Sequence, residues 1–186
     1  MQADVESIAR NGPMMRTIVF AIAFLCCMGC SGKTMPSETY AKESLAVAED
    51  FLKNAHRIAD APFPSKDGLS REDRLKYLSE RVINDAKSFE PLIQRANSLK
   101  PPEQFKPYHQ ALVNLITGEA KLMSEWGEAI GTQDRQLMEA AQSRLETHEA
   151  DALAQLVSAL AQLASTDPSA RQHLDQLIAK IAANPL

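Results

Sequence analysis

The sequence predicts an all-α protein, and three observations lead to this prediction. Hydrophobic residues make up 45% of the 186-residue chain, but only 5% of the residues are aromatic and only seven are glycine. A core of Leu, Ala, Ile and Val with few aromatic residues favours helices over sheets. After Ser37, apolar residues recur at helical steps of three and four. Four long stretches of this kind, joined by short breaks, predict an antiparallel four-helix bundle with a short fifth helix at the C-terminus.

The first helix is expected over residues 37–59, with Ser37 as its N-cap. Its apolar positions follow helical spacing and are Leu45, Ala48, Phe51, Leu52, Ala55, Ile58 and Ala59. Pro62, Pro64 and Gly68 then interrupt the pattern, because proline has no N–H to donate and glycine is a poor helix former. A linker is therefore expected before the next helix.

The second helix is expected from Ser70 to the proline pair at 101 and 102. Ser70 stands three residues before Asp73, which makes an approximate capping box with Asp in place of Glu. The apolar stripe comprises Leu75, Leu78, Val82, Ala86, Phe89, Ile93 and Ala96. The residue before a proline is disfavoured in helical conformation, so Pro101 ends this helix, and Pro102 can begin the next one.

The third helix is expected to end at Gly131–Thr132 or, earlier, at Gly127. Its apolar side comprises Phe105, Tyr108, Leu112, Ile116, Ala120, Met123 and Ile130. Trp126 lies near its C-terminal end. A side chain this large is expected to close one end of the core, the alternative being an anchor for a partner or for a membrane interface.

The fourth helix is expected from about Asp134 to Ala164 and contains a seven-residue repeat over 152–165. The repeat places four residues on one seam, namely Leu153, Leu156, Leu160 and Leu163. Two heptads are few for an oligomeric coiled coil, so packing inside the bundle is favoured. Asp167 and Pro168 predict the cap and first residue of the fifth helix, with Leu174, Leu177, Ile178 and Ile181 as its apolar positions.

Charge and cysteine content narrow the classes of function. The net charge is −4, and the chain lacks the clustered Lys and Arg that phosphate contacts need. Nucleic acid is therefore not expected as a partner, and binding to anionic lipid by charge alone is disfavoured. The cysteines, Cys26, Cys27 and Cys30, fall within five residues, and none follows Cys30. The domain after Cys30 is thus expected to hold no internal disulfide and no thiolate metal site.

The histidines do not have the spacing of a di-iron site. Helical bundles hold such metals with Glu-x-x-His pairs, but the residues three positions before the histidines are Lys53, Lys106, Leu145 and Ala170. Non-covalent haem held by Met and His stays open, although apolar-face methionines such as Met123 and Met138 are expected to fill the core. No metal ligand and no cofactor are predicted.

His148 is the histidine of greatest interest, because it lies at the edge of an apolar stripe beside Glu146, Glu149 and Asp151. We expect a boundary histidine with solvated acidic neighbours; the alternative is a pH-sensitive group or a metal ligand. The chain shows no nucleophile elbow and no glycine-rich phosphate loop. We therefore predict no catalytic residues and do not expect an enzyme.

The N-terminal segment has the anatomy of a secretory signal. Arg16 precedes an apolar stretch of about a dozen residues, which ends at Gly29 before Cys30. This stretch is shorter than the roughly 20 apolar residues that a membrane-spanning helix needs. Acidic residues within 1–13 are unusual ahead of a signal. We therefore expect translation to start at Met14 or Met15, with Met1 as the alternative.

Residues 24–30 resemble the lipobox of bacterial type II signal peptides, in which an aliphatic residue and two small residues precede a lipidated cysteine. Gly29 occupies the small position, whereas Met28 and Cys27 depart from the pattern. The resemblance covers residues 14–30. It implies cleavage between Gly29 and Cys30, a diacylglycerol thioether on Cys30 and acylation of the new amino group. The alternatives are a simple secretory signal and an uncleaved anchor.

The expected organisation is an upstream extension (1–13), a signal peptide (14–29), a lipidated tether (30–36) and a helical-bundle domain (37–186). The tether spans at most about 20 Å, so the domain is expected close to the membrane. In the diderm sorting pattern that the lipobox resembles, Ser31 permits transfer to the outer membrane, where the domain would face the periplasm.

Two functions are compatible with this organisation. The first is a non-enzymatic interaction or accessory role in the cell envelope, with the membrane and a protein partner or a second copy as its contacts. The alternative is a periplasmic carrier of a small ligand or metal, haem included, with a pocket between the helices.

Overall fold

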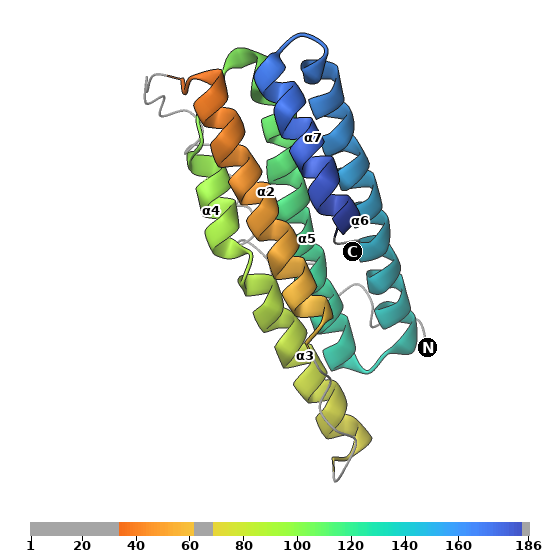
Figure 1. Ribbon diagram of the computed structural model, residues 1–186. Coiled ribbons are helices and arrows are strands. Elements are labelled where there is room, and N and C mark those ends of the chain that lie inside the picture. Colours follow the sequence, from red (N-terminus) through yellow and green to blue (C-terminus); the bar gives the residue numbers. More distant parts are fainter. Residues whose placement is uncertain (1–33, 62–68, 184–186) are drawn as a thin grey trace, which may run out of the picture. The chain divides into compact units, whose positions relative to one another are not determined.

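The computed structural model describes residues 34–61 and 69–183, and these residues form helices joined by short turns, with no strand among them (Figure 1). The elements are α2 (Ser37–Ala59), α3 (Arg71–Lys87), α4 (Glu90–Ser98), the short 3₁₀ helix η2 (Glu103–Phe105), α5 (Lys106–Thr132), α6 (Arg135–Ala164) and α7 (Pro168–Ala183). The prediction of an all-α protein is confirmed.

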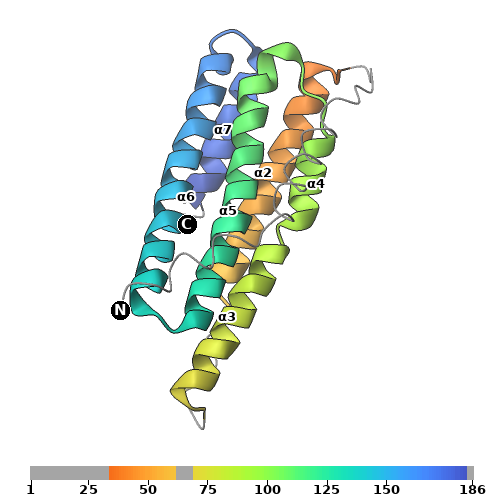
Figure 2. The ribbon, with the colours of Figure 1, turned by 180° about the vertical axis from the view of Figure 1, so that it is seen from behind.

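Helix α5 makes the most extensive contacts with the other helices. It packs against α3 and α4 on one side and against α6 on the other, while α7 packs against α6 and α2. Figures 1 and 2 show α2 and α7 side by side, with α5 between α6 and the α3–α4 pair. The largest fully buried side chains come from α2, η2, α5, α6 and α7 and from the join between α3 and α4, and they are Tyr40, Phe51, Phe89, Phe105, Tyr108, Leu112, Leu115, Ile116, Ile130, Leu156, Leu160 and Leu177.

The second predicted helix is divided into α3 and α4, so the prediction of one uninterrupted helix was wrong. The division falls at Ser88 and Phe89, just before Pro91 in the first turn of α4. Proline cannot donate to the carbonyl four residues earlier, here that of Lys87, and its ring collides with that carbonyl. The Ser88 hydroxyl donates to the Asp85 carbonyl at 2.6 Å and closes the last turn of α3.

Two predicted N-caps, Ser70 and Asp167, are confirmed, and Asp134, predicted only as the approximate start of its helix, is a third N-cap. The side chains of Ser70, Asp134 and Asp167 accept backbone N–H groups from the first turns of α3, α6 and α7, respectively. Each bond satisfies a donor that the helix itself leaves unpaired. These caps place the starts of the three helices where the sequence predicts them.

The predicted cap at Ser37 was wrong. Pro36 occupies the N-cap position of α2, and its carbonyl accepts the Tyr40 N–H at 2.9 Å. Ser37 is already the first helical residue, and its hydroxyl accepts a hydrogen bond from Gln104 Nε2 at 2.9 Å. The serine therefore links the start of α2 to η2 instead of capping its own helix.

The glycines near the end of α5 form a close contact with α3. Helix α5 continues past Gly127 to Thr132, and Gln133 then takes the left-handed conformation with φ 60°. A Cβ added to Gly127 would lie 2.7 Å from Ile83 Cγ1. The Ser79 hydroxyl donates to the Gly127 carbonyl at 2.7 Å. Gly127 therefore does not end the helix; it lets the two backbones approach.

The leucine repeat of α6 packs inside the domain. Leu156, Leu160 and Leu163 are buried, and Leu153 is half-buried against the same core. The seam predicted from the repeat is thus a core seam, as expected from its short length.

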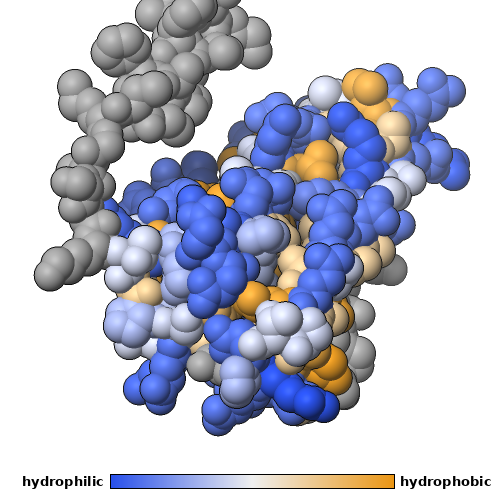
Figure 3. Space-filling view, turned by 90° about the horizontal axis from the view of Figure 1, so that it is seen from above, coloured by the Kyte–Doolittle hydropathy of each residue, from blue (hydrophilic) through white to orange (hydrophobic). Residues whose placement is uncertain are grey.

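One end of the described part has a mostly hydrophilic surface. Figure 3, a view onto the end that holds the start of α2 and the α6–α7 turn, shows hydrophobic residues scattered among hydrophilic ones. The large exposed hydrophobic residues are Leu69, Tyr77, Leu137 and Ile178. Among the helices of residues 34–61 and 69–183, none has the length and apolar content needed to cross a bilayer.

Candidate functional site

The residues predicted for processing, Gly29 and Cys30, lie outside the described residues. Cleavage and lipidation at these positions stay predictions. The described helices contain two other groups of side chains with chemical potential: a buried cluster between α2, α5 and α7, and a groove between α5 and α6.

The buried group, called here the tyrosine–histidine cluster, consists of Tyr40, Ser44, Tyr108, His109 and His173. Tyr40 and Ser44 lie one turn apart on α2. Tyr108 and His109 lie in the first turn of α5, and His173 lies on α7. The Tyr108 hydroxyl is 3.0 Å from His173 Nε2, and the Tyr40 hydroxyl is 3.0 Å from His109 Nδ1. The cluster therefore links three helices that are far apart in the sequence.

Aromatic packing holds the cluster rigidly. The rings of Tyr108 and His173 meet edge to face, with centroids 5.1 Å apart and planes at 77°. Tyr40 makes a similar contact with Phe105, with centroids 5.1 Å apart. Such edge-to-face pairs add to the stability gained from burial alone. Both tyrosines are fully buried, and His173 is 2% exposed.

Burial keeps the cluster uncharged. It raises the pKa of both Tyr40 and Tyr108 well above the ordinary value, and hydrogen bonding to Ser44 offsets only part of this rise. Burial lowers the pKa of His173 to about 4 and also lowers the pKa of the half-buried His109. The hydroxyls and imidazoles thus act near neutral pH as hydrogen-bonding groups without charge.

The hydrogen bonds of His173 are incomplete. Its Nδ1 is buried and has no hydrogen-bond partner within the described part of the chain. A neutral imidazole carries one donor and one acceptor, and Tyr108 satisfies only one of them. An unpaired buried polar atom of this kind is uncommon in a folded protein and is a candidate for a functional contact.

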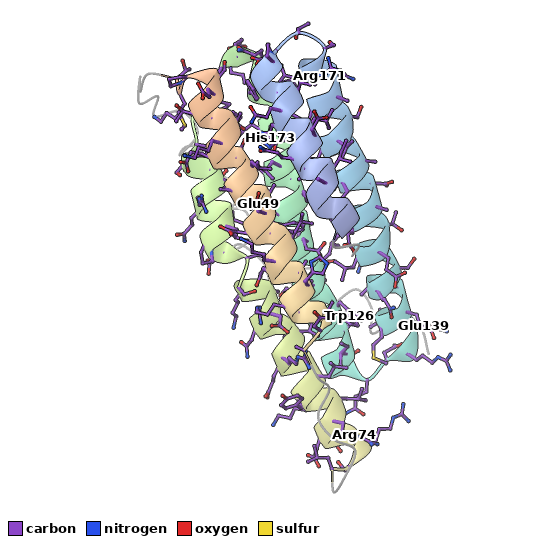
Figure 4. The ribbon with its side chains drawn as sticks, in the orientation of Figure 1. Glu49, Arg74, Trp126, Glu139, Arg171 and His173 are labelled. Carbon is purple, nitrogen blue, oxygen red and sulfur yellow. The ribbon has the colours of Figure 1, made fainter. Side chains whose placement is uncertain are left out.

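A groove of about 450 Å³ runs between α2 and α7 beside this histidine. Its walls are Glu38, Ala41, Lys42 and Leu45 from α2 and Pro168, Gln172, His173 and Gln176 from α7. Figure 4 shows His173 between these two helices. Most of these side chains are small or polar. They leave a groove open, whereas interlocking apolar side chains would close the space between two helices.

The second groove, of about 680 Å³, lies between α5 and α6. His148 of α6 is half-buried there and places its ring against Gly118 of α5, in the space that a Cβ would need. Its Nε2 is 3.5 Å from the Leu115 carbonyl. His148 is thus a boundary residue, in agreement with the prediction, and the other walls are mostly polar: Asn114, Thr117, Ser143, Arg144, Thr147, Asp151, Ala152 and Gln155.

Glu119 on α5 is a buried acid that the sequence prediction missed. It is 8% exposed, and its Oε2 has no hydrogen-bond partner among the described residues. Burial, with a smaller contribution from the negative charge of Glu149 on α6, raises the pKa of Glu119 to about 7. The signal was present, because Glu119 lies three residues after Ile116 and four before Met123 on the apolar stripe.

The remaining candidates have core roles. Trp126 packs against the core near the end of α5, as predicted (Figure 4). Met123 is buried in the core and Met138 packs against it. Within residues 34–61 and 69–183, no group of three or more His, Cys, Asp or Glu side chains could hold a metal ion.

Comparison with protein-family models, with curated proteins and with solved structures gives no match for this chain.

Proposed function

We propose that the chain is a lipid-anchored extracytoplasmic protein with a non-enzymatic interaction or accessory role in the cell envelope. The anchor in this proposal is Cys30, reached by cleavage after Gly29. The observation that carries the proposal furthest is the hydrogen bond from the Met35 N–H to the Lys100 carbonyl, at 3.0 Å. The chain is therefore already bound to the helical domain five residues after the cysteine.

The short distance along the chain from Cys30 to Met35 would keep the domain close to a bilayer. Five residues span at most about 17 Å when extended. Helix α5, with 27 residues, is about 40 Å long. The end of the domain that holds the start of α2 would therefore lie nearest the lipid, and the α5–α6 turn at Gln133 would point toward partners farther away.

We also propose that the domain is an antiparallel four-helix bundle, with α3 and α4 acting as one broken helix and α7 as the short fifth element. The short connection between α5 and α6, at Gln133 and Asp134, supports antiparallel neighbours. The packing of α3 and α6 on α5 and of α4 on α2 supports the same arrangement. In this description α7 lies along α2 and α6.

Metabolic labelling with a palmitate analogue tests the anchor. We expect label in the wild-type chain and in the matched control Cys27→Ser, and none in Cys30→Ser, because only Cys30 would become the modified N-terminus. Equal labelling of Cys30→Ser and wild type would overturn the proposal.

Cross-linking in native membranes, followed by purification, tests the interaction role. We expect a defined cross-linked species, either a second copy of this chain or one other envelope protein at fixed stoichiometry. Recovery of the uncross-linked monomer alone would count against an interaction role.

A second candidate is a carrier of a small molecule, and the α2–α7 groove favours it. The unpaired Nδ1 of His173 stands beside a groove with one cationic and two amide side chains, those of Lys42, Gln172 and Gln176. Native mass spectrometry of membrane-extracted protein separates the two candidates. A stoichiometric mass increment beyond the lipid supports a carrier, and its absence supports the interaction protein.

A further inference from the structure

Among the side chains of helix α7 that the structure describes, at 168 and 170–179, few are buried. Among its residues whose side chains are described, the buried ones are Ala170, His173 and Leu177, at steps of three and four, and Leu174 is partly buried. They face α2 and α6, the neighbours of α7. One of the three buried side chains described for this helix is thus a titratable group.

The hydrogen bonds of His173 suit the neutral ring and not the charged one. Nε2 pairs with the Tyr108 hydroxyl at 3.0 Å, while Nδ1 has no partner in the described structure. A protonated imidazole has two N–H donors and a positive charge. The second donor would then be buried without an acceptor, and burying an unpaired charge is strongly unfavourable.

Among the described side chains, none places an unpaired negative charge at the ring. From α5 the titratable groups of the cluster are Tyr108, which burial keeps protonated, and His109, which burial keeps uncharged. From α2 they are Tyr40, also kept protonated by burial, and, along the groove, Glu38 and Lys42, which carry opposite charges. From α6 the core receives the apolar side chains of Leu156, Leu160 and Leu163. Burial is the cause of the low pKa of His173.

We propose that His173 makes the docking of α7 sensitive to acid, so that a proton on its imidazole releases this helix from α2, α6 and Tyr108 of α5 while the other helices stay folded. Release would expose the Tyr108 side of α5 and the apolar face of α7 together.

The expected size of the effect follows from proton linkage. The pKa of His173 is lowered from 6.5 to about 4 in the docked state. Docking is therefore fully favoured above pH 6.5, weakens as the pH falls below that value, and reaches its full loss below about pH 4. A shift of this size changes the docking equilibrium roughly 300-fold in total, and roughly 60-fold between pH 7 and pH 4.5.

Amide hydrogen exchange on the full chain, read by mass spectrometry and corrected for the intrinsic pH dependence of exchange, tests the proposal. The quantity of interest is the protection of peptides from α7 relative to peptides from α3, because α5 carries Glu119, which titrates between these pH values. Between pH 7 and pH 4.5 we expect this ratio to fall roughly 60-fold in the wild-type chain. An unchanged ratio, or an equal loss of protection in α3, would overturn the proposal.

His173→Gln supplies the decisive variant, because glutamine can still bond to Tyr108 but does not titrate in this range. The ratio should then stay constant with pH, whereas in the matched variant His148→Gln, which lies on α6 outside the tyrosine–histidine cluster, it should fall as in wild type. A fall that persists in His173→Gln contradicts the proposal. If His173→Gln does not fold, NMR titration of the histidines in the wild-type chain tests the proposal instead. We then expect His173 to take up its proton over the same pH range in which α7 loses its protection. Protonation of His173 while α7 stays protected would contradict the release.

Discussion

The side of α5 that faces α3 is built on backbone contact, whereas the side that faces α6 and α7 buries titratable side chains. Toward α3, Gly127 admits the neighbouring backbone and Ser79 donates to its carbonyl at 2.7 Å. Toward α6 and α7, Glu119 and His173 each bury a polar atom without a partner in the described structure. On the α3 side of α5 the polar groups at the contact are thus hydrogen-bonded. On the other side two buried polar atoms have no partner among the described residues.

This difference separates a fixed interface from a responsive one. The α3 side contains no group whose charge changes near neutral pH among the residues at the glycine contact. On the other side, the folded state loses stability when Glu119 becomes charged at high pH. It also loses stability when His173 becomes charged at low pH. We therefore expect the α6–α7 side to be most stable between these limits and the α3 side to be insensitive to pH.

The largest effect is expected for Glu119→Gln at alkaline pH. The pKa of Glu119 is raised from 4.5 to about 7 by burial and by Glu149. A raised acid pKa favours the folded state below it, so the wild-type chain loses stability as the pH rises from 4.5 to 7. Glutamine removes this loss, and above pH 7.5 the variant should be more stable than wild type by about 3 kcal/mol. Urea unfolding at pH 5 and pH 8 measures the difference; parallel pH profiles would contradict it.

Gly127→Ala should destabilise the α3 side by about 2 kcal/mol. The new Cβ would lie 2.7 Å from Ile83 Cγ1 and 3.2 Å from the Ser79 carbonyl, so backbone must move. Overpacking of this kind exceeds the gain of about 1 kcal/mol in helix propensity.

The control for this substitution is Gly131→Ala, whose Cβ would meet only the Ser79 side chain, with Oγ at 3.1 Å. We expect a change in the free energy of unfolding within about 0.5 kcal/mol, because the propensity gain offsets the small adjustment. Equal destabilisation by the two alanines would show that the α3 contact is not specific to Gly127.

Tyr108→Phe should destabilise by about 1–2 kcal/mol, since it leaves both nitrogens of His173 unpaired. The exposed Tyr77, with 46% of its surface accessible, provides the control Tyr77→Phe, which should leave the free energy of unfolding unchanged. Thermal unfolding at pH 7 measures both variants. Equal stability of Tyr108→Phe and wild type would mean that the Tyr108–His173 bond does not hold α7.

The smallest effect is expected for Gly118→Ala in the α5–α6 groove. The new Cβ would occupy the place of the His148 ring, but this ring is half-buried and can turn toward solvent. The weak contact that it loses, 3.5 Å to the Leu115 carbonyl, is offset by better helix propensity. We expect a stability change within about 0.5 kcal/mol together with a displaced His148 resonance in NMR spectra. A loss above about 2 kcal/mol would mean that His148 is held firmly in place.

Much of the fold could be predicted from the sequence, because apolar spacing and capping residues act locally. Ser70, Asp134 and Asp167 begin their helices as predicted. Pro91 was overlooked, although its missing N–H is also a local signal. The roles of Ser37 and Gly127 depend on a partner from another element, Gln104 and Ser79 respectively. Spacing along one helix does not reveal such partners.

The candidate site was less predictable for the same reason. Tyr108 and His173 are separated by 65 positions and meet only because α7 returns alongside α2 and α6. Their residue types gave no motif, and Tyr108 was expected only as a core residue. Glu119, by contrast, interrupts an apolar stripe, and a search of the predicted core for charged residues would have found it.

The proposed role as an anchored envelope protein depends on Cys30, and intact-mass measurement of the chain extracted from its native membrane tests it most directly. We expect a mature protein that begins at Cys30, with the mass of a diacylglycerol thioether and one amide-linked acyl group. The Met35–Lys100 contact would then hold the domain within about 17 Å of that lipid. A mature chain with an unmodified Cys30, or one cleaved elsewhere, would contradict the anchor and with it the proposed placement of the domain at the membrane.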